Sequence, residues 1–313
     1  MPTLLSGYDM PQLGLGTWRS DKEKLKSALL HALKIGYRHI DCAAMYFNEA
    51  IVGEALEESG IIRKELFITS KIMPTDMHID CVESALEKTL KELKTNYVDL
   101  YLLHWPFRFS HSPSQFPVPV SERLGYNIEE IGKIWKILER LVDEGKIRSL
   151  GVSNFSVKKI KELLSVARHP VTCNQLESHI YLQQTKVIDW HKETGIVVTC
   201  YCPLGNPSRP ATFIHSDGPA IPALENPVIC EIARNHNCTP AQVLLSWAMK
   251  RNTVPIPKSV TFTRLDENFL STFLQLTDDD IARISLLDEN HRFSRGEQFC
   301  VEGQNWQDNW DLD

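Results

Sequence analysis

The stretch that is most informative about the fold reads RHIDCAAMYFNE and occupies residues 38–49. Its first half predicts a short apolar strand that ends at Asp41, and a turn of small residues then presents Tyr46 five positions later. Two later segments, 66–71 (LFITSK) and 98–104 (VDLYLLH), predict strands that also end on an ionisable side chain. The carboxyl ends of parallel strands in a barrel meet at one rim. We therefore expect four side chains to converge there, namely Asp41, Tyr46, Lys71 and His104.

Strand-like and helix-like segments alternate along the rest of the chain. Apolar residues at three- and four-residue spacing indicate helices, and short continuous apolar runs are typical of a parallel sheet covered on both faces. The expected strands are 13–16, 39–41, 66–71, 98–104, 147–152, 171–177, 196–202 and 254–257, and the expected helices are 24–35, 51–59, 81–93, 128–143, 157–166, 183–194, 228–236, 240–250, 264–273 and 278–287. Eight such strands in 313 residues predict a closed α/β barrel, the (β/α)8 TIM barrel, as a single domain over residues 1–313.

Four segments lie outside this alternation. Residues 3–5 and 12–13 flank a turn and predict a small N-terminal β-hairpin. The segments 107–127, 205–227 and the extended C-terminal tail 288–313 are too long to be simple connectors. Active sites of (β/α)8 barrels lie on the loops that follow the strands, so we expect these three long segments to shape a substrate site.

The composition narrows the class of protein. A net charge of −6 argues against nucleic acid or an anionic membrane as partner. No apolar run reaches the roughly 18 residues that a membrane span requires, and the first residues lack the pattern of a secretory signal. Cys200 and Cys202 would point to opposite faces of one strand, which makes them a poor metal-binding pair. We expect a cytoplasmic protein with reduced thiols, no metal and no nucleic-acid or membrane partner; a closed barrel favours a monomer, with a dimer as the alternative.

The four residues at the predicted rim form a set suited to proton transfer. An ammonium about 4 Å from a phenol stabilises the phenolate by roughly 4 kcal/mol before desolvation is subtracted. We therefore expect Lys71 to lower the pKa of Tyr46 by up to about two or three units, and Asp41 to keep Lys71 protonated. His104 can donate a hydrogen bond that orients a carbonyl oxygen. The set suits the protonation of an alkoxide as it forms, or the reverse reaction.

Each of these residues also has a simpler structural explanation. Asp41 at a strand end can cap a loop, Lys71 can be a solvated lysine, His104 can be a core histidine and Tyr46 can simply pack. Only their convergence on one rim favours a functional role. On these residues alone, a barrel isomerase or lyase with other chemistry remains an alternative.

Several motifs resemble signatures of the aldo-keto reductase family, and the resemblance covers almost the whole chain. The motifs are GLGTW (14–18), GYRHIDCA (36–43), LHWP (103–106), GVSNF (151–155) and IPKS (256–259). Segments 152–159 and 292–301 are similar to the plant-type aldose reductase branch. The resemblance implies a barrel that binds NADPH and reduces aldehydes or ketones to alcohols. It also implies that Tyr46 is the proton donor, that Lys71 and Asp41 tune it, and that His104 orients the carbonyl.

The sequence contains no dinucleotide fingerprint of the GxGxxG type, because Arg19 stands where the third glycine is needed. Lys258 instead ends a predicted strand and Arg264 opens the next helix, where cations suit a phosphate monoester. We therefore expect the 2′-phosphate of NADPH rather than the bare ribose of NADH. A solvated basic turn is the alternative explanation.

The family resemblance extends the expected cofactor site. It places Ser259, Glu267 and Asn268 near the adenosine, Ser153, Asn154 and Gln175 at the carboxamide, and Tyr201 against the nicotinamide ring. Thr17, Trp18, Cys202 and Leu204 complete the expected contacts. The chain departs from the family pattern at Cys202 and Asn206, where serines are usual, so the pyrophosphate side is expected to hold fewer hydroxyls.

The substrate is less well defined by the sequence. Trp18, Phe47, Trp105 and Phe116 are expected to wall an aromatic cleft around His104. Phe47, next to the catalytic tyrosine, favours apolar or aromatic carbonyls, whereas five loop arginines offer a carboxylate or phosphate site: Arg108, Arg123, Arg209, Arg292 and Arg295. Aldoses, sugar phosphates and reactive or aromatic carbonyls are therefore all candidates. The alternative to an enzyme is a structural or regulatory barrel that binds cofactor with little turnover.

Overall fold

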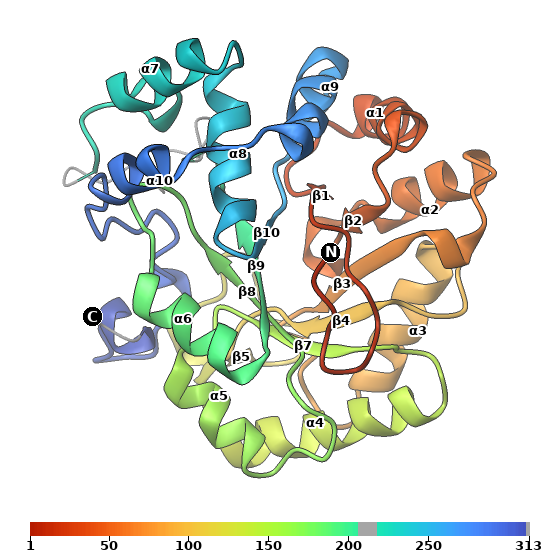
Figure 1. The fold of residues 1–313 in the computed structure, drawn as a ribbon. Coiled ribbons are helices and arrows are strands. Elements are labelled where there is room, and N and C mark those ends of the chain that lie inside the picture. The colour runs from red at the N-terminus through yellow and green to blue at the C-terminus, as the bar shows by residue number, and fades with distance from the viewer. Residues whose placement is uncertain (206–217, 311–313) are drawn as a thin grey trace.

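The computed structural model describes residues 1–205 and 218–310, and a sheet of eight parallel strands forms the centre of this part (Figure 1). The strands are β1 (Gly14–Gly16), β2 (His39–Asp41), β3 (Phe67–Ile72), β4 (Leu100–Leu103), β7 (Leu150–Ser153), β8 (Cys173–Glu177), β9 (Val197–Tyr201) and β10 (Thr253–Pro255). Neighbours in the sheet follow chain order from β1 to β10. Pro257, just beyond β10, accepts a hydrogen bond of 3.0 Å from the backbone nitrogen of Gly16, which closes the sheet. The predicted (β/α)8 barrel is confirmed.

Helices cover the outside of the barrel (Figure 1). They are α1 (Lys22–Ile35), α2 (Glu49–Glu58), α3 (Val82–Glu92), α4 (Ile128–Asp143), α5 (Val157–Leu164), α6 (Thr185–Thr194), α7 (Pro227–Asn235), α8 (Pro240–Lys250), α9 (Phe262–Leu270) and α10 (Asp278–Ser285). Helix α1 shows the local signals: the Asp21 carboxylate accepts hydrogen bonds from two first-turn amides, and Gly36 ends the helix at a φ of 122°. Its buried stripe packs against the sheet, because Leu25, Leu29 and their neighbours recur at helical spacing.

Two glycines of β1 permit the close approach that closes the barrel. A Cβ atom on Gly14 would lie 2.7 Å from the His39 ring, and one on Gly16 would lie 2.9 Å from the carbonyl oxygen of Ile256. Any side chain at either position would push neighbouring strands apart. The GLG sequence therefore has a packing explanation in the barrel.

A separate aromatic cluster lies at the C-terminal ends of the strands. Trp105, Phe107 and Phe109 follow β4, and they stack with Phe299 from the C-terminal tail, whose ring centroid is 4.2 Å from that of Trp105. The tail is held by further contacts, including a hydrogen bond from Lys159 to the carbonyl of Asn309. This packing places a distant part of the sequence beside the ends of β4 and β8.

Several expectations need correction. The N-terminal turn pairs residue 3 with residue 9 through one antiparallel bridge, so residues 12–13 are not its second arm. The segment 107–127 contains a short antiparallel ribbon of β5 (Arg108–Phe109) and β6 (Arg123–Gly125). Helix α9 begins before Arg264, and residues 271–273 form a separate 3₁₀ turn. Residues 206–217, including Asn206 and Arg209, lie outside the described residues.

Two further observations concern the whole of the described part. Among the described helices, none has both the length and the apolar content that crossing a membrane would require. All eight cysteines are free thiols, and four of them are buried: Cys42, Cys173, Cys200 and Cys300.

Candidate active site

Tyr46 is presented by a 3₁₀ turn, Ala44–Tyr46, that directly follows β2. The backbone nitrogen of Tyr46 donates to the carbonyl of Ala43 at 2.9 Å, and the Asn48 amide donates to the carbonyl of Thr17, also at 2.9 Å. Small residues at 43 and 44 allow this tight turn against the barrel. The turn therefore fixes the phenol over the strand ends.

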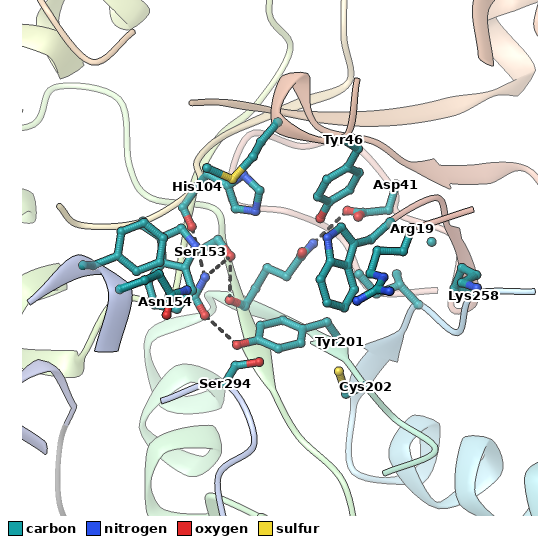
Figure 2. A pocket seen from close by; sticks show the side chains of 18 of the residues that line it. Arg19, Asp41, Tyr46, His104, Ser153, Asn154, Tyr201, Cys202, Lys258 and Ser294 are labelled. Atoms are coloured by element: carbon teal, nitrogen blue, oxygen red, sulfur yellow. Dashed lines mark hydrogen bonds between the residues drawn. The ribbon is translucent and has the colours of Figure 1, made fainter. Parts of the chain in front are cut away.

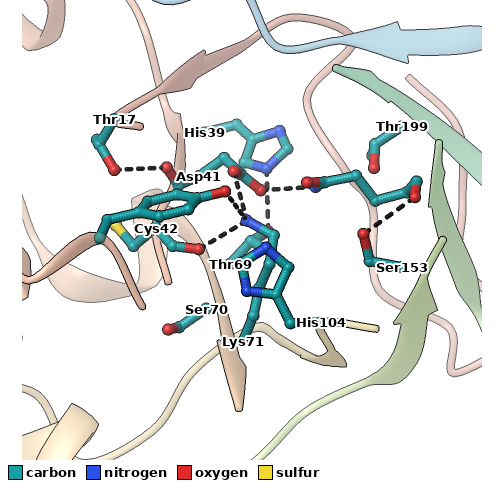
Figure 3. A network of polar contacts seen from close by, with 12 residues as sticks. Thr17, His39, Asp41, Cys42, Thr69, Ser70, Lys71, His104, Ser153 and Thr199 are labelled. Carbon is teal, nitrogen blue, oxygen red and sulfur yellow. Dashed lines mark hydrogen bonds and ion pairs between the residues drawn. The ribbon is translucent and has the colours of Figure 1, made fainter. Parts of the chain in front are cut away.

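The Lys71 side chain is fully buried in the barrel. Figure 3 shows its amine directed at Asp41 and at the backbone of Cys42. Its Nζ donates to Asp41 Oδ1 at 2.6 Å, to the carbonyl of Cys42 at 2.8 Å and to Tyr46 Oη at 3.3 Å. The direction of the Lys71 side chain follows from the alternation along β3, because the preceding side chain, Ser70, points the other way and hydrogen-bonds to Glu49. The amide of Gln175 donates to the second carboxylate oxygen of Asp41 at 2.8 Å. Every donor of this buried ion pair is thus directed at an oxygen.

Burial dominates the ionisation of this group. It raises the pKa of Tyr46 to about 12, because the favourable effect of Lys71 is smaller and is partly offset by Asp41. Burial disfavours the charged lysine as well, but Asp41 and Tyr46 outweigh it and hold the pKa of Lys71 above its usual value. The expected lowering of the Tyr46 pKa below that of a free tyrosine is therefore wrong, because the burial of the phenol outweighs the charge of Lys71.

His104 lies immediately after β4 and faces Tyr46 edge-on, with the ring centroids 5.6 Å apart. Burial and the nearby Lys71 hold its pKa well below the usual value, so the ring is neutral at physiological pH. Its Nδ1 is buried and has no hydrogen-bond partner among the described residues. Nε2 is therefore the ring atom that can reach a ligand above Tyr46.

A polar shelf lies beside these four residues, on the ends of β7, β8 and β9 (Figure 2). The Asn154 amide donates to the carbonyl of His104 at 3.0 Å and accepts from the Tyr201 hydroxyl at 2.8 Å. Ser153 Oγ donates to the carbonyl of Gln175 at 3.1 Å. One oxygen lone pair on Asn154 and the amide oxygen of Gln175 remain for a ligand. The shelf can therefore accept hydrogen bonds from a primary amide while Tyr201 offers a ring face.

A cationic pole lies on another side of the pocket, where Figure 2 shows Arg19 and Lys258. Burial lowers the pKa of Lys258, and the charges of Arg19 and Arg264 lower it further. Three cations that repel one another favour an anion between them. Arg264 is on the first turns of α9, together with Glu267 and the buried Asn268, and the buried Ser259 precedes this helix.

Residues from the rim, the polar shelf and the cationic pole border one pocket of about 520 Å³. Most of the predicted site residues line it: Trp18, Asp41, Tyr46, His104, Trp105, Phe116, Ser153, Asn154, Gln175, Tyr201, Cys202, Leu204 and Lys258. Lys71 lies behind this lining. Thr17, Ser259, Arg264, Glu267 and Asn268 lie outside it, and the Thr17 hydroxyl instead bonds to the carbonyl of Asp41 at 2.9 Å.

Two predictions about the substrate end are not supported. Phe47 lies outside the pocket lining and is 62% exposed, because its backbone adopts the left-handed region at a φ of 52° and turns the ring away. The four described loop arginines also lie outside the lining and contact the protein itself. Arg108 pairs with Glu130, Arg123 donates to the carbonyl of Cys300, Arg292 donates to Gln184 and Arg295 lies over Trp306.

Other pocket residues were not predicted from the sequence. They are Gly16, Arg19, Met45, Phe109, Pro117, Val118, Pro203, Ile256, Pro257, Ser294, Gln298 and Phe299. Arg19 and Met45 directly adjoin Trp18 and Tyr46 in the sequence, and this proximity could have indicated that they line the pocket. Ser294, Gln298 and Phe299 come from the tail, and no local pattern indicates which tail residues face inward.

The fold and this rim define an α/β barrel protein with a buried lysine–carboxylate pair and a tyrosine at the end of one pocket. Residues 11–289 match the family model described as "Aldo/keto reductase family". The chain is 42% identical to the aldo/keto reductase slr0942 of Synechocystis sp., covering 98% of this chain and 95% of that protein. It is 40% identical to aldo-keto reductase family 1 member A1 of Gallus gallus, over 93% of this chain and 89% of that one.

Solved structures agree with the sequence comparison. The aldose reductase from Schistosoma japonicum superposes with a TM-score of 0.84 at 36% identity, covering 96% of this chain and 98% of that one. An aldo-keto reductase from a deep-sea metagenome library gives a TM-score of 0.81 at 32% identity, covering 93% of this chain and 96% of that one. The chain belongs to the aldo/keto reductase family.

Proposed function

We propose that this protein is an NADPH-dependent reductase that converts aldehydes or ketones to alcohols, with Tyr46 as proton donor. The observation that carries the proposal is the contact of 3.3 Å between Lys71 Nζ, behind the pocket lining, and Oη of Tyr46, which lines the pocket. A protonated phenol, a cation behind it and a neutral imidazole beside it match the needs of alkoxide protonation. The relative from Schistosoma japonicum, named as an aldose reductase, supports carbonyl reduction as the reaction type.

The residues present suit NADPH. Asn154 and Gln175 have hydrogen-bonding capacity left for a carboxamide, and the Tyr201 ring is available for stacking. The charges of Arg19, Lys258 and Arg264 suit phosphate groups. When bound, NADPH supplies the hydride. The choice of NADPH over NADH rests on this concentration of positive charge at the adenosine end.

The protein's own groups complete the reaction. His104 Nε2–H donates a hydrogen bond to the carbonyl oxygen and directs it toward the Tyr46 hydroxyl. As negative charge develops on that oxygen, Tyr46 transfers its proton to it. Lys71 then stabilises the phenolate that remains, and Asp41 keeps Lys71 charged and in place. Lys71 therefore stabilises the phenolate, which forms only during the proton transfer.

The substrate end of the pocket favours uncharged aromatic carbonyls. Trp105, Phe109 and Phe116, with Val118 and Phe299, give this end its apolar walls. No described arginine of the long loops reaches it, since Arg108, Arg123, Arg292 and Arg295 contact other parts of the protein. An anionic group in such walls would lose its hydration without gaining a partner. We therefore expect a lower kcat/KM for sugar phosphates than for aromatic aldehydes.

A panel of aldehydes tests both parts of the proposal. NADPH oxidation is followed with 4-nitrobenzaldehyde, 4-carboxybenzaldehyde, xylose and glucose 6-phosphate, and each is repeated with NADH. The expected order in kcat/KM places the uncharged aromatic aldehyde first and NADPH above NADH. Absence of turnover with every aldehyde would contradict carbonyl reduction, whereas preference for the carboxylate or phosphate would contradict only the assigned substrate class.

A further inference from the structure

Glu177 is the last residue of β8, and its carboxylate is completely buried. Oε1 accepts hydrogen bonds from the backbone nitrogen of Phe293 at 2.8 Å and from His179 Nε2 at 2.9 Å. Oε2 accepts from the backbone nitrogen of Ser294 at 2.7 Å. A single side chain at a strand end thus binds two consecutive amides from a segment more than a hundred residues away.

The surroundings keep this carboxylate ionised. Burial alone would raise its pKa, but the bond with His179, the charge of Arg292 and the Phe293 amide together hold the pKa of Glu177 below its usual value. Hydrogen bonds to an ionised acceptor are stronger than those between neutral groups. The carboxylate is therefore a strong anchor for the tail backbone, and the proton-transfer set around Tyr46 makes no use of it.

The anchored segment forms one side of the pocket. We name residues 293–299 the tail wall; within it Ser294, Gln298 and Phe299 line the pocket. The Phe299 ring stacks on Trp105 with centroids 4.2 Å apart, and a Cβ on Gly296 would lie 3.1 Å from the same indole. A small displacement of the tail wall would therefore change the aromatic face that meets a substrate.

The anchor also places the tail wall beside the polar shelf. Glu177 is in register with Tyr201 in the pairing of β8 with β9. Figure 2 shows Ser294 next to Tyr201, and both residues line the pocket. The Glu177 carboxylate binds the tail amides, whereas the Tyr201 hydroxyl is held separately by Asn154.

We propose that Glu177 is a positioning residue for substrate selection: by binding the amides of Phe293 and Ser294 it sets the tail wall and so determines the affinity for aromatic carbonyls. The proposal rests on the carbonyl reduction proposed above. Small aldehydes that do not reach Phe299 would not depend on this anchor. The role is therefore distinct from a general contribution to stability, which would affect all substrates equally.

The substitution Glu177→Gln tests the proposal, because an amide has only one acceptor oxygen and leaves one tail amide facing an N–H group. Glu139→Gln is the matched control: Glu139 is also buried and accepts from two consecutive amides, those of Arg168 and His169, far from the pocket. We expect KM for 4-nitrobenzaldehyde to rise about tenfold in Glu177→Gln, as for loss of one charge-assisted hydrogen bond. The kcat for propanal and the Kd for NADPH should stay at the parent values, and Glu139→Gln should leave all three unchanged.

Hydrogen exchange at the amides of residues 293 and 294 gives a readout that does not require turnover. Faster exchange at these amides in Glu177→Gln supports the anchor, whether or not the parent protein reduces aldehydes. If the parent reduces no aldehyde, only the proposed function is refuted. The positioning role would be overturned if hydrogen exchange and KM were both unchanged. It would also be overturned if activity with both aldehydes and affinity for NADPH fell by the same factor. If Glu177→Gln does not fold, Glu177→Asp, which withdraws the carboxylate by one methylene, is judged by the same outcomes.

Discussion

Lys71 Nζ lies 3.3 Å from Tyr46 Oη, and the same nitrogen is 2.6 Å from Asp41 Oδ1. The carboxylate therefore acts in two directions, because it keeps the lysine charged but also disfavours a phenolate nearby. Burial adds to the second effect, and the pKa of Tyr46 is raised to about 12. Lys71 consequently reduces the energy of a phenolate formed during the reaction without producing one beforehand.

This electrostatic arrangement predicts a level pH profile for reduction. The pKa of Tyr46 is raised to about 12, so its hydroxyl stays protonated at neutral pH. The pKa of His104 is well below its usual value, so its ring stays neutral at the same pH. We expect kcat/KM for aldehyde reduction to be constant between about pH 6 and pH 8. Alcohol oxidation needs the phenolate and should become faster as the pH rises. A reduction profile with a midpoint inside that interval would contradict these protonation states.

Removal of the buried cation should affect both rate and stability. In Lys71→Met the phenolate loses its stabilising charge, and we expect kcat for reduction to fall by a factor of about 10² to 10⁴. Asp41 would also remain buried without its partner, which costs about 3–5 kcal/mol in the free energy of unfolding. Urea denaturation measures the second effect.

The double variant Asp41→Asn/Lys71→Met separates the two consequences. It removes both charges, so it should recover part of the lost stability and none of the lost activity. If the double variant is as unstable as the sum of the single variants, the ion pair is not the coupled unit described here.

Cofactor selectivity should depend on the cationic pole. Lys258→Met removes one of three neighbouring positive charges, and we expect the Kd for NADPH to rise about 10- to 100-fold while the Kd for NADH changes little. Quenching of tryptophan fluorescence measures both constants. Lys250→Met, at an exposed position near the end of α8, is the control and should change neither. If the Kd values for NADPH and NADH rise by the same factor, Lys258 does not contact the 2′-phosphate.

Two helical glycines form a matched pair for stability. A Cβ on Gly53 in α2 would lie 2.1 Å from the carbonyl oxygen of Glu92, whereas one on Gly132 in α4 would first meet Val166 at 3.4 Å. We expect Gly53→Ala to lower the free energy of unfolding by about 1–3 kcal/mol or more. Gly132→Ala should be neutral or should stabilise by up to about 1 kcal/mol through helix propensity. Equal effects in urea denaturation would show that α2 and α3 can separate at no cost.

The barrel and the four residues at its rim could be predicted from the sequence because both depend on local patterns. Asp41, Lys71 and His104 each end or follow a short apolar run, and the parallel topology then brings them together. The sign of the Tyr46 pKa shift could not be predicted, since it depends on how completely the turn at 44–46 is buried.

The pocket walls were the least predictable part. The direction of Phe47 depends on one backbone angle, and a sequence pattern does not report it. The role of Glu177 depends on hydrogen bonds to residues 293 and 294, which carry no side-chain signal because the donors are backbone amides. The shape of the pocket walls therefore depends on contacts between segments far apart in the chain, which local sequence patterns do not indicate.

The most direct measurement for the central claim is single-turnover reduction of 4-nitrobenzaldehyde by Tyr46→Phe, together with the Kd for NADPH. The variant keeps the ring and loses only the hydroxyl that contacts Lys71. Reduction should be lost almost completely, by about 10³-fold or more, while the Kd stays within about twofold of the parent. Reduction at the parent rate would show that the proton comes from another group and that the contact between Lys71 and Tyr46 is not the source of catalysis.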